Sequence, residues 1–360
     1  MTRTLLGAAA ALTLAAPASA QEVVNVYNWS DYIDKSILEE FTAETGIEVV
    51  YDVFDSNEVL ETKLLAGGTG YDVVVPTGTF LQRQIQAGIY QELDRSKLPN
   101  WDNLWDEIMA RAETYDPGNA HAINYMWGTT GIGYNVGAVE ERLGVSTIDS
   151  WDVIFDPEVI AQFADCGVHM LDAPAEMIPA ALNYLGYDPD SKDTGEIEEA
   201  AELLASIRPH VQKFHSSEYI NALANGDICL AVGWSGDVLQ ARDRAAEAGN
   251  DVIVEYAIPD EGAQIWFDMM AIPADAPNPD NAHAFLNYIM RGEVMAKASN
   301  YVYYANGNEA SKEFLNEDVI GDPAIYPSDE TIDNLFATTP YPPRVQRVVT
   351  RAWTRVKTGS

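Results

Sequence analysis

The sequence has little positive charge. Its 360 residues include 21 Lys and Arg against 56 Asp and Glu, which gives a formal net charge of −35 at pH 7. Nucleic acids and anionic membrane surfaces are bound through clustered Lys and Arg, so this composition argues against both as partners. The negative field would instead attract cations. A hydrophobic fraction of 47% with 10% aromatic residues is ordinary for a folded protein, so the acidity does not indicate disorder.

Cysteine and histidine are also scarce. The two cysteines, Cys166 and Cys229, have no histidine at zinc-ligand spacing, and the five histidines show no metal-binding pattern. We therefore expect no metal and no cofactor. In an exported protein an even number of cysteines predicts a disulfide, which on the chain-entropy model would stabilise the fold by about 4 kcal/mol. Two buried free thiols are the alternative.

Long apolar runs are missing after the N-terminal region. No later stretch reaches the ~18 consecutive apolar residues that a membrane span needs. Residues 1–20 have the features of a secretion signal: Arg3 supplies the positive region, the run from Leu5 to Ala16 the apolar core, and Ala18 to Ala20 the small residues of a cleavage site. We expect an exported mature chain that starts at Gln21.

Enzyme signatures are absent or incomplete. Gly233 to Asp237 resembles a nucleophile elbow but lacks the glycine two residues after the serine. Gly131 to Gly137 has one residue too many between its last glycines for a dinucleotide fingerprint. Glycosidase chemistry by a pair of carboxylates is not excluded by the sequence, because an acidic chain offers many such pairs. The sequence therefore favours a binding protein over an enzyme, with an exported hydrolase as the alternative.

The sequence does contain alternating strand and helix patterns. Val23 to Tyr27, Ile47 to Phe54 and Tyr71 to Pro76 are apolar, β-rich runs, and helical periodicity follows each of them. Such alternation predicts a parallel sheet with right-handed crossovers. Similar patterns return between residues 196 and 272. Because the chain has about twice the length of a typical domain, we expect an α/β fold of two lobes, each a mainly parallel sheet flanked by helices.

Aromatic, hydroxyl and carboxylate residues gather at the ends of four predicted strands. Ligands of open parallel sheets bind at the carboxyl edge of the strands. Carboxylates and aromatic faces suit an ammonium group, so the sequence predicts a cation-binding cleft. The residues concerned are Trp29, Ser30, Asp31, Tyr32, Thr77, Trp234, Asp237, Trp266 and Asp268.

Each of these residues also has a simpler explanation. Ser30 or Asp31 could cap the helix that follows. The tryptophans could belong to the core, which is the commoner place for this residue. Asp237 and Asp268 could be solvated loop acids. Their joint occurrence at four strand ends favours the cleft.

Longer blocks of the sequence resemble the periplasmic putrescine-binding proteins of polyamine ABC transporters, and the resemblance covers nearly the whole mature chain. It implies a periplasmic binding protein with two lobes, a ligand cleft between them, and delivery of the ligand to a membrane permease. We also expect a monomer. The blocks are Tyr27 to Tyr32, Val50 to Leu60, Gly128 to Asn135, Leu171 to Pro174, Phe214 to Ser217, Asn225 to Cys229 and Arg351 to Trp353.

The expected lobes are each made of two separate parts of the chain. The expected boundaries are residues 21–132 and 254–299 for the N-terminal lobe, 135–251 and 306–360 for the C-terminal lobe, and 131–135, 252–257 and 300–305 for the hinge crossovers.

The resemblance also implies roles for the site residues by matched position. An aromatic box would stack on the methylene and ammonium groups of the ligand, carboxylates would bind its nitrogens, and Ser30 and Thr77 would add hydroxyl groups. Tyr304 and Glu176 come from the resemblance alone, because Tyr301 to Tyr304 has the pattern of a buried aromatic strand and Glu176 that of a loop acid. The box is Trp29, Tyr32, Trp234, Trp266 and Tyr304, and the acids are Glu176, Asp237 and Asp268.

The choice among polyamines depends on a few positions. A four-carbon diamine holds its nitrogens about 6 Å apart, so it needs two anionic poles with an apolar sleeve between them. Thr77 and Thr79 keep two hydroxyls that are similar to those of the putrescine type, and Ala173 is small as in that type. Trp266 instead resembles the spermidine type. We favour putrescine, with spermidine as the alternative ligand and a polyamine sensor as an alternative role.

Overall fold

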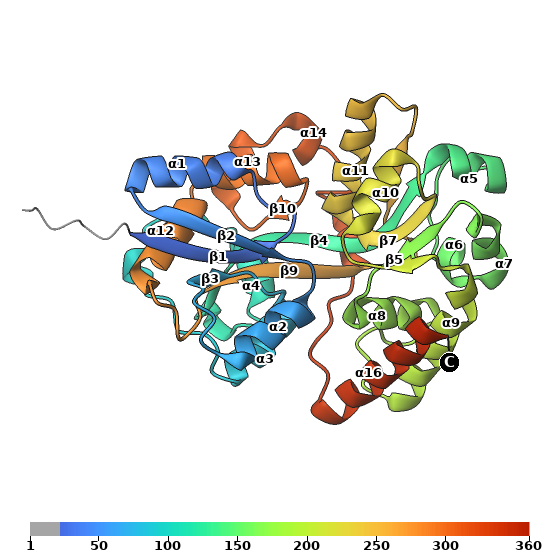
Figure 1. Cartoon of the computed structure of the whole chain (residues 1–360), viewed down its shortest axis with the longest axis horizontal. Coiled ribbons are helices and arrows are strands. Elements are labelled where there is room, and N and C mark those ends of the chain that lie inside the picture. The colour runs from blue at the N-terminus through green and yellow to red at the C-terminus, as the bar shows by residue number, and fades with distance from the viewer. Residues whose placement is uncertain (1–21, 360) are drawn as a thin grey trace, which may run out of the picture.

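The computed structural model describes residues 22–359, and the predicted secretion signal lies outside them. A mixed ten-stranded sheet runs along the long axis of the molecule with helices on both of its faces (Figure 1). The strand order is β2-β1-β3-β9-β4-β7-β5-β6, and β8 and β10 also pair with β4. Among the described helices none is long and apolar enough to cross a membrane.

The strands range from two residues in β3, β6 and β10 to fourteen in β4, near the centre of the sheet. The strands are β1 Val23–Trp29, β2 Glu48–Phe54, β3 Val73–Val74, β4 Ala122–Asn135, β5 Val168–Met170, β6 Lys213–Phe214, β7 Leu230–Trp234, β8 Val254–Ala257, β9 Gln264–Ala271 and β10 Ala305–Asn306.

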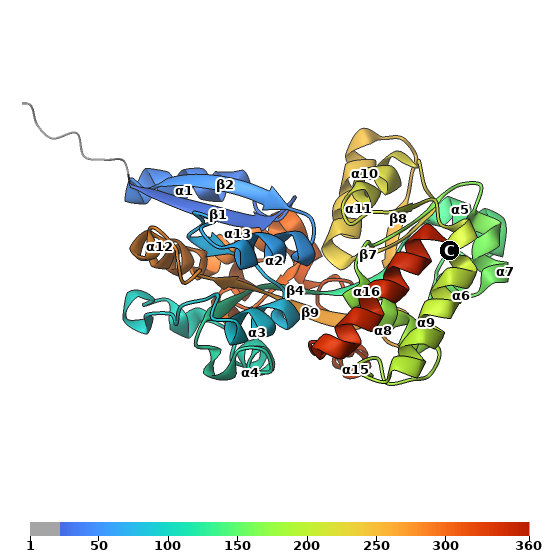
Figure 2. The same cartoon turned by 60° about the horizontal axis from the view of Figure 1, so that its bottom comes forward.

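The helices cover both faces of this sheet. The α-helices are α1 Lys35–Thr45, α2 Asn57–Ala66, α3 Gly78–Gln86, α4 Asp106–Ala112, α5 Val136–Leu143, α6 Asp152–Phe155, α7 Pro157–Ile160, α8 Pro174–Tyr184, α9 Thr194–Ile207, α10 Glu218–Asn225, α11 Ser235–Ala248, α12 Pro279–Ile289, α13 Gly292–Val302, α14 Glu317–Ile320, α15 Asp329–Asp333 and α16 Pro343–Thr358. Figure 2 shows α16, in red, running across the second lobe beside α9.

Helix α1 shows how local sequence sets the bounds of an element. Its N-cap is Asp34, whose carboxylate accepts a hydrogen bond from the Ser36 backbone N–H at 2.9 Å. Ile37 and Phe41, four residues apart, are buried on one face. Gly46 ends the helix in the left-handed conformation, with φ of 76°. The alternative that Ser30 or Asp31 caps this helix is therefore wrong.

Buried residues form two hydrophobic cores, one in each lobe. Along β4 the first core includes Trp127 and the second begins at Ile132. This fourteen-residue strand pairs with β9 in its first part and with β7 in its last part. The two-lobed α/β fold is thus confirmed. The lobes share one sheet. Its parallel pairs lie on the two sides of the centre, among β1, β2 and β3 in the first lobe and among β5, β6 and β7 in the second. The central strands β4 and β9 pair antiparallel with each other and with their neighbours β7 and β3.

The hydrophobic core to which each residue belongs also indicates where the chain crosses between the lobes. Ala257 belongs to the second core and Ile265 to the first, while Ile325 belongs to the first and Val345 to the second. We infer that the second and third crossovers lie within 258–264 and 326–344, later in the chain than the expected 252–257 and 300–305.

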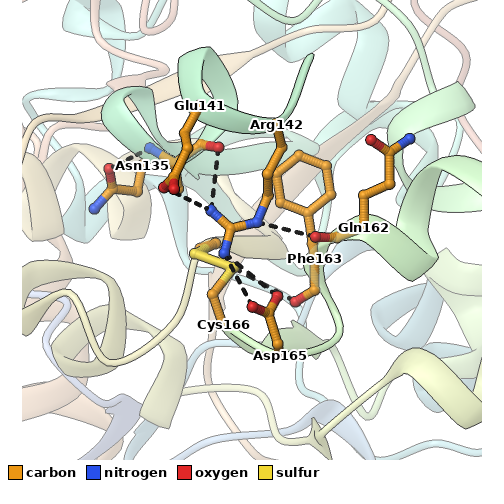
Figure 3. The surroundings of a disulfide bond; sticks show 9 residues. Asn135, Glu141, Arg142, Gln162, Phe163, Asp165 and Cys166 are labelled. Carbon is orange, nitrogen blue, oxygen red and sulfur yellow. Dashed lines mark hydrogen bonds and ion pairs between the residues drawn. A yellow bond between two sulfur atoms is a disulfide. The ribbon is translucent and has the colours of Figure 1, made fainter. Parts of the chain in front are cut away.

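A disulfide joins Cys166 to Cys229, with Cα atoms 5.7 Å apart and a sequence separation of 63. The predicted pairing is confirmed, and the alternative of free thiols is wrong. The bond ties the loop before β5 to the chain entering β7. Figure 3 shows the guanidinium of Arg142 beside it, bonded to the Asp165 carboxylate and the Gln162 carbonyl. The disulfide thus lies at the edge of the second core, among side chains that α5 helps to hold.

Candidate functional site

A cavity lies between the two lobes, lined by residues of both. All the predicted ligand-binding residues line it except Asp31, and two further residues, Asp55 and Ser216, join them. The lining residues are Trp29, Ser30, Tyr32, Asp55, Thr77, Glu176, Ser216, Trp234, Asp237, Trp266, Asp268 and Tyr304.

The first wall follows from strands β1 and β3. Trp29 is the last residue of β1, and its Nε1 donates to the Val75 carbonyl at 2.9 Å, which fixes the indole against the neighbouring strand end. Thr77 follows β3 and is the N-cap residue of α3. Parallel strands bring these residues to one edge of the sheet, as predicted.

Aromatic rings from both lobes meet edge to face inside the cavity. The centroids of Trp29 and Trp234 are 5.5 Å apart, those of Tyr32 and Tyr304 5.2 Å, and those of Trp266 and Tyr304 5.4 Å. Edge-to-face aromatic pairs stabilise the folded protein by more than the burial of their apolar surface alone. Tyr304 can lie this close to α11 because position 236 is glycine, where a Cβ would come within 2.5 Å of the ring.

Tyr304 reaches the cavity from a turn, so the predicted aromatic strand over Tyr301 to Tyr304 is wrong. Helix α13 ends at Val302, and Tyr303 adopts the left-handed conformation with φ of 59°. This turn directs the next side chain inward, and Tyr304 is 1% exposed.

Asp268 is the anionic group of the first wall. It accepts hydrogen bonds from the Tyr32 hydroxyl at 2.8 Å and the Thr77 hydroxyl at 2.6 Å. Trp266 and Asp268 lie within β9, and not at a strand end as expected, because β9 crosses the site as a connecting strand. Two residues apart, they point to the same face of the sheet and so enter the cavity together.

Asp237 is the anionic group of the opposite wall. It lies in the first turn of α11, where the positive end of the helix dipole favours a carboxylate. The hydroxyls of Tyr219 and Tyr304 each donate to it at 2.8 Å. The Tyr304 oxygen also accepts from the Asp237 backbone N–H at 3.1 Å.

Glu176 is the third buried acid, from the first turn of α8. It accepts hydrogen bonds from the Trp234 Nε1 at 2.8 Å and from the hydroxyl of Thr130, which lies on the shared strand β4. Hydrogen bonds therefore join the indole of Trp234, the Glu176 carboxylate and strand β4 in one network.

The three acids are held where ionisation is costly. Burial raises the pKa of Glu176 to about 7, that of Asp237 to about 6 and that of Asp268 to about 7, while the hydroxyl and indole donors oppose these shifts. In the part of the chain that the structure describes, no Lys or Arg forms an ion pair with any of them. A cation entering the cavity would supply the missing charge.

Asp31 lies beside the cavity and not in its wall. Its backbone has φ of 55°, and its carboxylate accepts a hydrogen bond from the guanidinium of Arg244 at 2.9 Å. Asp55 and Ser216, which sequence reasoning missed, follow β2 and β6. The rule that ligands lie at the carboxyl ends of parallel strands was a sufficient signal for both. No group of His, Cys, Asp and Glu within residues 22–359 could hold a metal ion.

Comparisons with known proteins agree with this geometry. The model of a family described as bacterial extracellular solute-binding protein matches residues 36–327. A putrescine-binding periplasmic protein of Pseudomonas aeruginosa is 54% identical over 99% of this chain and 96% of its own length. Another, of Escherichia coli, is 50% identical over 98% and 96%. The solved structure of a putative spermidine/putrescine ABC transporter protein of Listeria monocytogenes superposes with a TM-score of 0.84, at 31% identity, over 94% of this chain and all of that one.

Proposed function

Because the chain belongs to the family of bacterial extracellular solute-binding proteins, we propose that it captures a polyamine in the periplasm and delivers it to the permease of an ABC importer. The relatives are solute-binding components of transport systems and not enzymes, so the hydrolase alternative loses its support.

One observation carries the proposal: three buried carboxylates without basic partners surround a cavity lined with aromatic rings. A protonated amine loses its hydration when the cavity takes it up, and charge-assisted hydrogen bonds to Asp237, Asp268 and Glu176 can offset that loss. The rings provide cation–π contacts and cover the methylene chain. A neutral or anionic solute would leave these acids without compensation.

The two ends of such a ligand would contact different lobes. Asp268 lies on β9 with donors from the first lobe, whereas Asp237 and Glu176 belong to helices of the second. A diamine that binds both poles therefore has more contacts in the closed arrangement than in an open one, and this difference in contacts drives closure. The permease would recognise the closed form.

Putrescine is the ligand we favour. Both putrescine-binding relatives named above carry that ligand in their names, and the small Ala173, the residue before helix α8, agrees with that choice. Trp266 is the residue that favours spermidine, so spermidine stays the second candidate. A polyamine sensor would use the same cavity with a different partner.

A calorimetric and thermal-shift series with putrescine, spermidine, cadaverine and agmatine tests the proposal. We expect putrescine to raise the unfolding midpoint most, because ligand binding to the native state stabilises it by mass action. Mass spectrometry after incubation should return the amine unaltered. The matched control is Asp268→Asn, which keeps the shape of the cavity wall and should abolish the shift. No shift with any of the four amines would overturn the proposal.

A further inference from the structure

The described surface carries one group of basic side chains that lack partners. Within residues 22–359, all but four of the Lys and Arg side chains hydrogen-bond or ion-pair with a carboxylate, a carbonyl or another oxygen. The four exceptions are Lys35 on α1 and Arg344, Arg347 and Arg351 on α16, and all four residues are exposed.

The three arginines lie on one face of α16, which we call the α16 arginine face. Offsets of three and seven residues bring side chains to the same side of a helix. The opposite side buries Val345, Val349 and Trp353 in the second core. The helix is therefore anchored by its apolar side against α8 and α9, and the arginine side chains extend from a fixed support.

This face is a local exception to the charge of the molecule. The last 27 residues, 334–360, contain five Lys and Arg and no Asp or Glu, in a chain whose net charge is −35. Arg355 and Lys357, the other two, are engaged by Glu198 and Asp172. Among the described residues these three arginines have no carboxylate partner, so their charges are available to another molecule.

Helix α16 also borders a groove between the two lobes. Gln346 and Val349 line a groove whose other wall is formed by Glu58 and Phe80 of the first lobe. The floor includes Pro174, the first residue of the helix that carries Glu176 into the cavity. None of the three arginines lines the groove, but a molecule large enough to cover both the groove and the α16 arginine face would contact both lobes.

We propose that the α16 arginine face docks onto a cluster of carboxylates on the permease, an inference that rests on the proposed function. Arginine is suited to this contact because its planar guanidinium pairs with carboxylates in a bidentate geometry. Arg344 and Arg351 are about 10 Å apart along the helix, which matches a compact cluster of acids. An extended anionic lipid surface fits less well, because it would also face the acidic residues that surround the helix.

The test compares two charge-reversed proteins in cells that carry the chain's own transporter. The first is the triple variant R344E/R347E/R351E. The matched control is K35E/K97E/R111E, which changes the charge by the same amount at exposed sites on α1, in the 3-10 helix Arg95–Lys97 and on α4. We expect the first variant to lower putrescine uptake by about tenfold, since rim charges act mainly on association. The control should take up putrescine like the original protein, and both should keep their calorimetric Kd.

Further outcomes decide the inference. The conservative variant R344K/R347K/R351K keeps the charge and should retain most of the uptake. Equal uptake by the two charge-reversed proteins, with the Kd unchanged in both, would overturn the docking assignment. So would a loss of putrescine binding in R344E/R347E/R351E alone, because the face would then support the cavity. If the original protein sedimented with phosphatidylglycerol vesicles and R344E/R347E/R351E did not, the α16 arginine face would bind lipid and not the permease. Failure of the unmodified protein to bind any polyamine would overturn the proposed function itself.

Discussion

The guanidinium of Arg244 donates to the carboxylate of Asp31 at 2.9 Å, and this ion pair joins α11 of the second lobe to the turn after β1 in the first. It lies outside the cavity wall and bridges the two lobes, so we expect it to act mainly on closure of the lobes. The side chains are 34% and 45% exposed, and solvent screens their attraction.

Removal of this pair should therefore have a small effect. We expect Arg244→Ala to weaken putrescine binding by about two- to fivefold. Small-angle scattering should show a larger radius of gyration for the unliganded variant than for the original protein. Arg111→Ala, which breaks an exposed pair with Glu107 far from the cleft, is the control and should change neither quantity. Equal scattering of the two variants would show that the pair does not hold the lobes together.

Asp237→Asn should weaken putrescine binding by at least about 2 kcal/mol, because a buried charge pair is lost while its partner stays desolvated. The two tyrosine hydroxyls that donate to Asp237 hold the carboxylate in place. Isothermal titration calorimetry measures the change in Kd. The double variant Y219F/Y304F keeps the carboxylate charge, so its affinity for putrescine should lie between those of the original protein and Asp237→Asn. An unchanged Kd for Asp237→Asn would remove this acid from the site.

Binding should release protons and strengthen as the pH rises. The unliganded pKa values are about 7 for Glu176, about 6 for Asp237 and about 7 for Asp268, and a bound ammonium group favours ionisation and so lowers each pKa. The ligand-bound state therefore holds fewer protons, and the Kd should increase by at least about tenfold from pH 8 to pH 5.5.

Calorimetry in buffers that differ in ionisation enthalpy measures the protons released. Glu176→Gln removes one of the titrating groups and should release fewer protons at pH 7 than the original protein. A Kd that is constant across this pH range would contradict the assignment of these acids as ligand contacts.

Trp234→Ala should cost about 1–3 kcal/mol of binding through the loss of cation–π and methylene contacts. Trp234→Phe separates the two roles of this residue, because it keeps an aromatic face but removes the Nε1 donor to Glu176. We expect its affinity to fall between those of the other two proteins in a fluorescence or calorimetric titration. Wild-type affinity for the alanine variant would place Trp234 in the core alone.

Loss of the disulfide should destabilise the fold without changing the cavity. On the chain-entropy model, closing a loop of 63 positions contributes about 4 kcal/mol, so the free energy of unfolding of C166A/C229A should be lower by about that amount, with a lower denaturant midpoint. Urea unfolding followed by circular dichroism measures the difference. The Kd for putrescine should stay the same, because neither cysteine lines the cavity.

Much of the cavity could be predicted from the sequence because strand ends are readable as patterns. Trp29, Thr77 and Trp234 follow or end apolar runs, and parallel pairing brings such ends together. Tyr304 was beyond this reasoning, since its direction depends on the left-handed turn at Tyr303. Glu176 was beyond it too, because its hydrogen bonds come from strand β4, 46 positions earlier, and from Trp234, 58 positions later.

The bounds of the lobes are hard to predict from the sequence for a related reason. Local periodicity shows where strands lie but not which strands pair, and β4 pairs with partners from both lobes. The expected crossovers at 252–257 and 300–305 therefore stay predictions, and core membership favours later passages, within 258–264 and 326–344.

The sharing of β4 has a consequence for folding and engineering. Each half of the protein is assembled from non-contiguous stretches, and one continuous strand supplies hydrogen bonds to both. Cutting the chain once therefore cannot produce either lobe as an autonomous fragment. Unfolding of one lobe would also expose the sheet edge of the other, so we expect a single cooperative unfolding transition, where two separate domains would give two.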